Sequence, residues 1–157
     1  MNVCHLCGIP WDAGFFDESH VFELDPNGIL GPALNAGQEL VLARYELHRN
    51  YCGVLMSFAQ FTNLSVGNDP QFRTPGYQWQ ISCNGQPRDP YLTLDHIINP
   101  WGYGGVPVQL RLEEGCVVEL VIRNTGATGG NILNQVGGRI TGRYWYNTEY
   151  GGAPKPL

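Results

Sequence analysis

The sequence predicts an all-β fold, an antiparallel β-sandwich of jelly-roll type with an extended N-terminal arm. The main observation is the segment 106–123, in which apolar and polar side chains alternate on both sides of a Glu-Glu-Gly turn. Alternation with a period of two is typical of strands that bury one face. The same alternation recurs in 77–83, and the 21 Gly and 11 Pro supply the turns that many short strands need.

Residues 1–37 are predicted to form the arm, because their apolar residues follow no sustained period and three prolines interrupt them. A short strand at 20–24 is the one regular element expected there. An extended segment that cannot pair its own backbone, yet holds a Trp and three Phe, is expected to lie against another surface. That surface is either the sandwich itself or a neighbouring subunit, and the neighbour is preferred.

The sandwich is predicted over 38–150, followed by a flexible tail at 151–157. The segment 106–123 is interpreted as one hairpin, and Asn84 with Gly85 has the composition of a second hairpin turn. In the first strand, Val41, Ala43, Tyr45 and Leu47 are expected to share the buried face. The other strands are expected at 53–61, 77–83, 91–98 and 138–147.

Charge and composition exclude several classes of function. The net charge is −5 and no basic run exists, so nucleic-acid binding has no electrostatic basis. No apolar stretch approaches the roughly 20 residues of a membrane helix, and the start lacks the pattern of a secretory signal. Five Cys, an odd number, fit a protein made in a reducing cytoplasm. Charged residues make up only 15%, which suits a surface covered by other subunits.

One set of residues has the spacing of a structural zinc site. Cys4 and Cys7 form a Cys-x2-Cys pair, and His48 with Cys52 adds a His and a Cys further along the chain. The alternative is a frayed terminus whose thiols bind nothing. Apart from this zinc, we expect no cofactor. Cys83 and Cys116 are expected to be small core residues.

No catalytic set is evident, so a non-enzymatic role is expected. The chain lacks a Gly-x-Ser-x-Gly nucleophile motif, and its histidines share no His-x-His spacing. The adjacent Glu113 and Glu114 lie in a tight turn, where they point apart. A small hydrolase or lyase on a sandwich fold would need a pocket that gathers ionisable groups, and the sequence predicts none.

Aromatic side chains are the remaining candidates for contacts with a partner, since Trp, Tyr and Arg are common anchors of protein interfaces. Trp145 is expected on the solvent face of the last strand, where either a partner or the arm covers it. Trp101 and Tyr103 could instead stack on sugar rings, which would make the protein a carbohydrate-binding module. The predicted partner-binding residues are Trp11, Phe15, Phe16, Trp101, Tyr103 and Trp145.

Four segments occur in a suggestive order: RYELHRNYCGVLMSFAQF, YQWQISCNGQP, VPVQLRLEEGCVVELVIRNTG and RITGRYWYN. Together they resemble the small sandwich proteins of tailed bacteriophage virions that decorate or cement the head or sit at the neck. The resemblance spans about residues 39–150, and the Cys-x2-Cys start is not part of it. It implies a non-catalytic protein of the virion, assembled in the host cytoplasm, and it would place the alternative carbohydrate-binding module on a virion neck or tail. It also implies a homo-oligomer, preferably a trimer, that binds the major capsid protein or neighbouring virion subunits.

Overall fold

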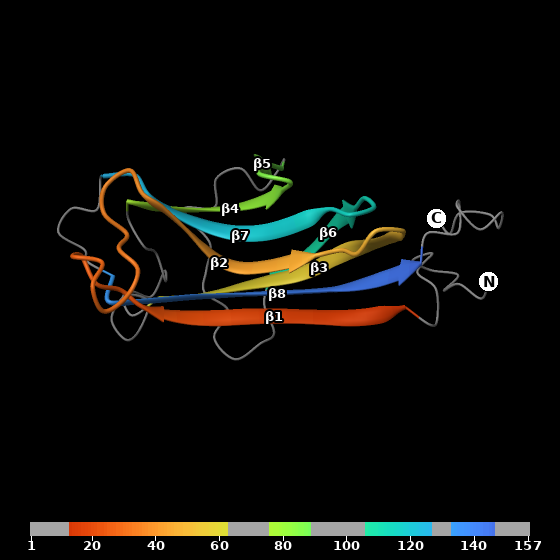
Figure 1. The fold of residues 1–157 in the computed structure, drawn as a ribbon, viewed down its shortest axis with the longest axis horizontal. Helices are drawn as coiled ribbons and strands as arrows, with labels where there is room; N and C mark the ends of the chain where they lie inside the picture. The colour runs from red at the N-terminus through yellow and green to blue at the C-terminus, as the bar shows by residue number, and fades with distance from the viewer. Residues whose placement is uncertain (1–12, 63–75, 89–105, 127–132, 147–157) are drawn as a thin grey trace.

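The computed structural model describes residues 13–62, 76–88, 106–126 and 133–146, and their regular structure is entirely β (Figure 1). The strands, in chain order, are β1 (Gly14–Glu23), β2 (Glu39–Glu46), β3 (Tyr51–Thr62), β4 (Tyr77–Cys83), β5 (Gln86–Pro87), β6 (Val106–Leu112), β7 (Val117–Asn124) and β8 (Gln135–Tyr146). The predicted strand at 91–98, the tail at 151–157 and residues 1–12 of the arm lie outside the described residues.

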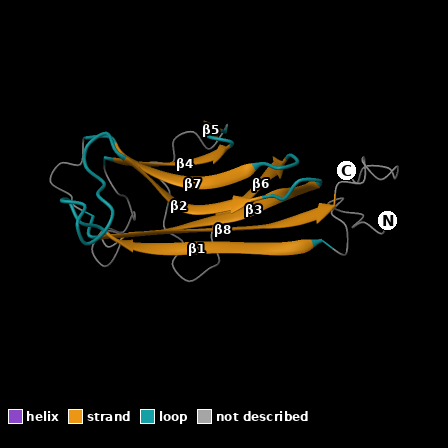
Figure 2. Cartoon of the chain, viewed as in Figure 1, coloured by secondary structure: helices purple, strands orange, loops and turns teal. Residues whose placement is uncertain are grey.

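The strands form two four-stranded antiparallel sheets that pack face to face (Figure 2). One sheet has the order β1-β8-β3-β6 and the other β2-β7-β4-β5. Counted inward from the two ends of the strand order, the strands pair as β1 with β8, β2 with β7, β3 with β6 and, in the middle, β4 with β5. This is the arrangement of a jelly roll, so the predicted fold class is confirmed.

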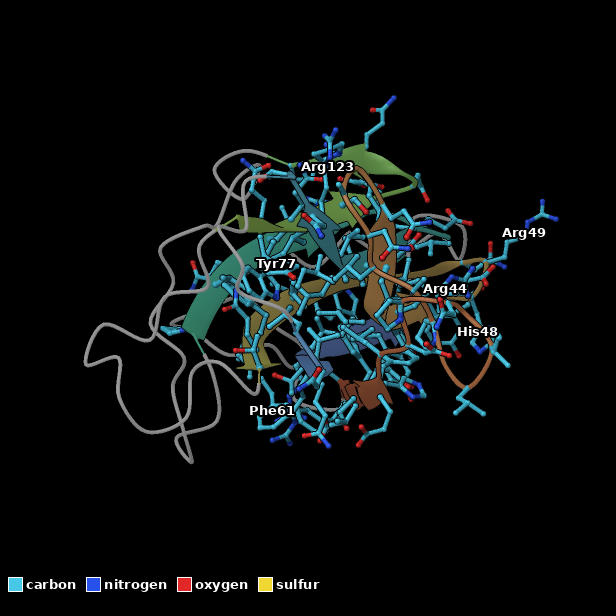
Figure 3. The ribbon with its side chains drawn as sticks, turned by 90° about the vertical axis from the view of Figure 1, so that its left-hand side faces the viewer. Arg44, His48, Arg49, Phe61, Tyr77 and Arg123 are labelled. Atoms are coloured by element: carbon cyan, nitrogen blue, oxygen red, sulfur yellow. The ribbon has the colours of Figure 1, made fainter. Side chains whose placement is uncertain are left out.

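Apolar side chains from both sheets fill the space between the layers, as Figure 3 shows. Trp79 and Phe58 are the largest fully buried residues, and they come from different sheets. Interdigitation of this kind is what alternate inward-facing positions produce in a sandwich. The other large side chains that are fully buried in the described part of the chain are Leu42, Leu47, Leu55, Ile81, Leu112, Val118, Leu120, Ile122, Val136 and Ile140.

Part of the predicted arm belongs to the sandwich. Residues 14–23 form β1, which pairs with β8 along its whole length. The sheet thus begins at Gly14, whereas the sequence placed the domain boundary at residue 37. Pairing with β8 satisfies backbone groups that an isolated arm would leave to solvent.

The segment 106–123 contains two strands, but they do not form the predicted hairpin. β6 pairs with β3 in one sheet, whereas β7 pairs with β2 and β4 in the other. The Glu113–Cys116 turn, with Gly115 at φ 67°, carries the chain across the core. The hairpin at Asn84 and Gly85 is present between β4 and β5, and both turn residues have the positive φ that a type I′ turn requires.

The first predicted strand also differs in which side chains it buries. A register shift between Val41 and Ala43 interrupts the pairing of β2 with β7. The bulge buries Leu42 and Ala43 together and leaves Val41 exposed. The expectation that Val41 faces the core is therefore wrong, because a bulge breaks the strict alternation of a strand.

Candidate partner-binding surface

The solvent side of the β1-β8-β3-β6 sheet presents side chains from three neighbouring strands. Residues directly opposite one another in an antiparallel ladder lie on the same face. Asp17 of β1 and Ser57 of β3 thus lie on either side of Thr141 of β8. We call this surface the outer face, and it includes Phe15, Asp17, Ser19, Val21, Cys52, Val54, Ser57, Arg139, Thr141, Arg143 and Trp145.

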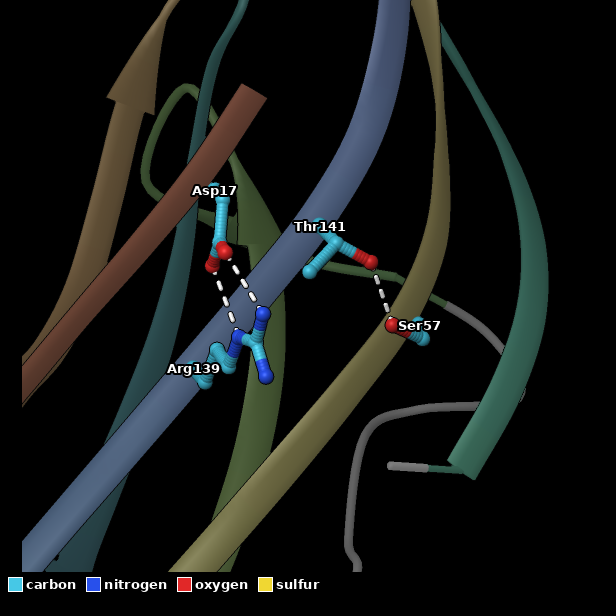
Figure 4. A network of polar contacts seen from close by, with 4 residues as sticks. All are labelled: Asp17, Ser57, Arg139 and Thr141. Atoms are coloured by element: carbon cyan, nitrogen blue, oxygen red, sulfur yellow. Dashed lines mark hydrogen bonds and ion pairs between the residues drawn. The ribbon is translucent and has the colours of Figure 1, made fainter. Parts of the chain in front are cut away.

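Hydrogen bonds between side chains connect the three strands in the middle of the outer face (Figure 4). Arg139 donates to both carboxylate oxygens of Asp17, from Nε at 2.7 Å and from Nη2 at 2.5 Å. These hydrogen bonds and the charge of Arg139 lower the pKa of Asp17, and the same contact raises the pKa of Arg139. The hydroxyls of Ser57 and Thr141 are also hydrogen bonded. The centre of the outer face is therefore held by its own polar contacts.

Phe15 lies beside this polar centre and remains a candidate for a contact with a partner. Its side chain is 55% exposed, and the guanidinium of Arg143 lies 5.3 Å from the ring centroid. Arg143 also donates to the carbonyl of Ala13 at 3.4 Å. An aromatic ring with a neighbouring cation is an arrangement that interfaces use.

Phe16 does not belong to the surface, which corrects its prediction as a partner-binding residue. It is 3% exposed, and its ring stacks on Tyr45 at a centroid distance of 4.2 Å. Successive side chains of a strand point to opposite faces, so Phe15 and Phe16 cannot both be exposed on one surface. A partner could reach Phe16 only by opening the core.

Trp145 lies on the outer face, opposite the buried Cys52. Its indole Nε1 is buried and has no hydrogen-bond partner within the described part of the chain. The residue is half-buried. That a partner or the N-terminal arm covers Trp145 stays a prediction. Three other predicted contact residues lie outside the described residues: Trp11, Trp101 and Tyr103.

Among the described residues, the most exposed large apolar side chains lie in the loop between β1 and β2. Ile29 is 81% exposed and Leu30 is 91% exposed, and we call this pair the apolar tip. The tip sits on an ordered turn, because the Asp25 carboxylate accepts the backbone N–H groups of Asn27, Ile29 and Leu30 at 2.9–3.0 Å. The same hydrogen bonds lower the pKa of Asp25.

Sequence reasoning missed the apolar tip. The signal was present, since Asp25, Pro26, Asn27 and Gly28 are residues of a tight turn and an Ile-Leu pair follows them. Asp25 organises the turn through its side chain, and Gly28 takes the positive φ of 68°. A large apolar pair directly after such a turn lies within a loop, where no neighbouring strand buries it.

The predicted zinc site is described only in part. His48 is exposed in the turn before β3, with its ring 6.5 Å from that of Tyr51, whereas Cys52 is buried. Cys4 and Cys7 lie outside the described residues. Within the described ranges, no group of three or more His, Cys, Asp or Glu residues gathers as metal ligands do. The zinc site stays a prediction.

Cys83 and Cys116 are both buried in the core, as expected. Their thiols are in hydrogen-bond contact where β4 ends and β7 begins, with Arg88 near Cys83. The hydrogen bond from the Cys116 thiol, with Arg88, lowers the pKa of Cys83 to about 7. The pKa of Cys116 is raised, because its proton is held in that hydrogen bond and the site is desolvated.

The remaining observations concern membranes and known proteins. In the portion of the chain that the structure covers, no helix has the length and apolar character of a membrane span. No protein-family model, curated protein or solved structure matches the chain.

Proposed function

We propose that this protein is a structural, non-catalytic component of a bacteriophage virion that binds the capsid and stabilises it. The observation that carries the proposal is the apolar tip, Ile29 and Leu30, which an ordered loop holds in solvent. Large aliphatic side chains in such a position contribute nothing to the core of their own chain. They favour an attachment role, in which a partner covers them.

The physical gain from covering the tip is substantial for so few residues. Full burial of a Leu or Ile side chain contributes about 1.5–3 kcal/mol. Because Asp25 already orders the turn, binding loses less conformational entropy than it would with a flexible loop. A homo-oligomer would repeat the contact on a lattice of capsid subunits, so modest contacts would add up to tight attachment.

A protein that binds only the assembled capsid stabilises it by mass action, since bound protein shifts the equilibrium away from the dissociated subunits. The partner in this proposal is the major capsid protein or a neighbouring virion subunit. Jelly rolls occur in viral capsids and in lectins, and the fold by itself does not choose between them. The resemblance to virion accessory proteins and the apolar tip together favour the capsid.

The test uses phage particles from a lysate of the host that carries the gene. Particles are stripped of the protein and incubated with the purified full chain, and bound copies per head are counted against concentration. Wild type should saturate at a fixed number of copies and raise the temperature at which heads release their DNA. Leu30→Asp should weaken binding by at least about 10-fold, the equivalent of 1.4 kcal/mol.

Val41→Asp is the matched control, because Val41 is an exposed aliphatic residue in β2, outside the apolar tip. It should bind particles like wild type. Absence of the protein from purified particles, or equal binding by Leu30→Asp, would contradict the proposal. Saturable binding to glycans without binding to heads would instead support the carbohydrate-binding alternative.

A further inference from the structure

β1 forms an open edge of its sheet. It pairs with β8 on one side, and the described residues place no strand on its other side. Figure 1 shows β1 as the outermost strand of its layer. The outward N–H and C=O groups of an edge strand are a template on which another strand can pair. An open edge therefore needs either protection or a partner.

The other sheet edges carry features that oppose such pairing. β2 has a bulge between Val41 and Ala43. β5 has only two residues, one of them Pro87, and β6 contains Pro107. Bulges, short strands and prolines are the usual protections of an edge. β1, by contrast, runs for 10 residues without a proline or a register shift.

We propose that β1 is a dimerisation edge, on which β1 of a second copy of this chain pairs in antiparallel orientation about a two-fold axis at Ser19. The two sheets then join into one continuous sheet. The partner is a second copy because the sequence of β1 is complementary to itself in this register. The inference does not depend on the proposed capsid role.

Charge complementarity favours this register. A two-fold axis at Ser19 places Glu18 opposite His20 of the second copy, and by symmetry this contact occurs twice. An imidazole N–H can donate to a carboxylate in either protonation state of the ring. An axis at Glu18 would instead bring two carboxylates together, and an axis at His20 would bring two imidazoles together. An axis between two residues would pair inner with outer side chains and misalign the faces of the joined sheet.

The same register covers exposed apolar surface. Phe15 and Val21 are 55% and 65% exposed on the outer face of β1. With the axis at Ser19, Phe15 of one copy lies diagonally across from Val21 of the other, a spacing that aromatic side chains can bridge. Both ends of the paired strands gain this contact. The edge therefore offers backbone hydrogen bonds, a polar pair and an apolar contact to the same occupant.

The experiment is sedimentation equilibrium of the purified full chain over a range of concentrations, which should give twice the chain mass. Glu18→Lys places a lysine opposite His20 of the second copy, and His20→Glu places a second carboxylate opposite Glu18. Each variant should therefore weaken the dimer by at least about 10-fold. The double variant restores opposite charges and should return the dissociation constant to within about threefold of wild type. Glu39→Lys, at the start of β2 on the other sheet, is the control and should leave the mass unchanged.

Ser19→Cys tests the register directly, because the two introduced thiols would meet at the axis. It should form a disulfide-linked dimer on mild oxidation, which wild type with its five Cys should not form to the same extent. An unchanged circular dichroism spectrum would show that the variants fold. A monomer or trimer mass would overturn the proposal, and so would a dimer that Glu18→Lys leaves intact or that the double variant fails to restore.

Discussion

The ring of Phe16 occupies the space that a Cβ atom on Gly142 would need, directly across the ladder between β1 and β8. The same relationship recurs at the next pair on the same face, where the ring of Tyr144 lies over Gly14. A missing side chain on one strand lets an aromatic ring from the other lie against the backbone. From this position Phe16 stacks on Tyr45 of the opposite sheet, so the two glycines help to join the layers.

Gly142→Ala should therefore destabilise the fold, by about 1–3 kcal/mol as overpacked cores do. The added methyl group would meet Phe16 and also the backbone carbonyl of Val54, which cannot rotate away. Urea denaturation measures the change in the free energy of unfolding. Arg143→Ala, at the exposed neighbouring position, should change it by less than about 1 kcal/mol. Equal stability of Gly142→Ala and wild type would show that the core yields at this point.

The apolar tip should lose its order when Asp25 cannot accept hydrogen bonds. Asp25→Ala removes the acceptor of three backbone N–H groups, so the amides of Ile29 and Leu30 should exchange faster with solvent. Hydrogen exchange followed by NMR measures this effect. Asn27→Ala is the control. Asn27 donates its backbone N–H to the Asp25 carboxylate, and the substitution keeps that donor. Unchanged exchange in Asp25→Ala would mean that other contacts order the tip.

Lowering the pH should reduce the order of the apolar tip in the same way as Asp25→Ala. The pKa of Asp25 is lowered in the folded protein by hydrogen bonds from Leu30, Asn27 and Ile29. A carboxylate with a lowered pKa stabilises the folded turn above its unfolded pKa of about 3.9, and the contribution is lost as pH falls through the lowered value. The amide shifts of the tip should therefore change below about pH 4, with a midpoint below the ordinary Asp value. A midpoint above it would contradict the assigned cause.

Strand positions could be predicted from the sequence, but strand partners could not. Alternation identified β4 at 77–83 to the residue, and it located β6 and β7 within 106–123. It also suggested a hairpin there, which is wrong. Two strands joined by a short turn bury the same alternate residues whether they pair in one sheet or face each other across a core. Only the opposing strands decide between these arrangements, and they lie far away in the sequence.

β1 was harder to recognise for a physical reason. As an edge strand it exposes part of both faces, so Glu18 and His20 stand on the same face as Phe16, and the alternation is lost. The sequence does not show which of the two adjacent Phe residues is buried. The structure shows that Phe16 is buried and Phe15 is exposed. The apolar tip depends on the hydrogen bonds of one carboxylate, and no periodicity reports these.

The contact between Asp17 and Arg139 should contribute modestly to stability. Both side chains are partly exposed, and such pairs couple by about 0.2–1 kcal/mol. The two hydrogen bonds from one guanidinium place this pair toward the upper part of that range. A double-mutant cycle with Asp17→Ala and Arg139→Ala measures the coupling, which should shrink at 1 M salt, where the screening length is about 3 Å. A salt-independent coupling would indicate that packing rather than charge connects the two residues.

Cys83 should make stability depend on pH in the range from about 7 to 9. The hydrogen bond from Cys116, together with Arg88, lowers the pKa of Cys83 to about 7 from an ordinary value of 9.0. Because the folded-state pKa is lowered, the contribution is fully present above pH 9 and is lost as pH falls through about 7. Stability relative to Cys83→Ser should then rise across this window. The raised pKa of Cys116 has the opposite effect and lowers the stability of the fold above pH 9, where the Cys116 thiol ionises in the unfolded chain but not in the folded one.

Absorbance at 240 nm, which reports thiolate, gives an independent measurement of the same ionisation. Wild type should show one thiolate forming near pH 7 that is absent in Cys83→Ser and retained in Cys52→Ser. Cys116→Ala removes the thiol that donates to Cys83, so it should raise the pKa of Cys83, whereas Cys116→Ser keeps a hydroxyl donor and should raise it less. If all described thiols ionised only above pH 8, the contact between Cys83 and Cys116 would not stabilise a thiolate, and both cysteines would serve packing alone.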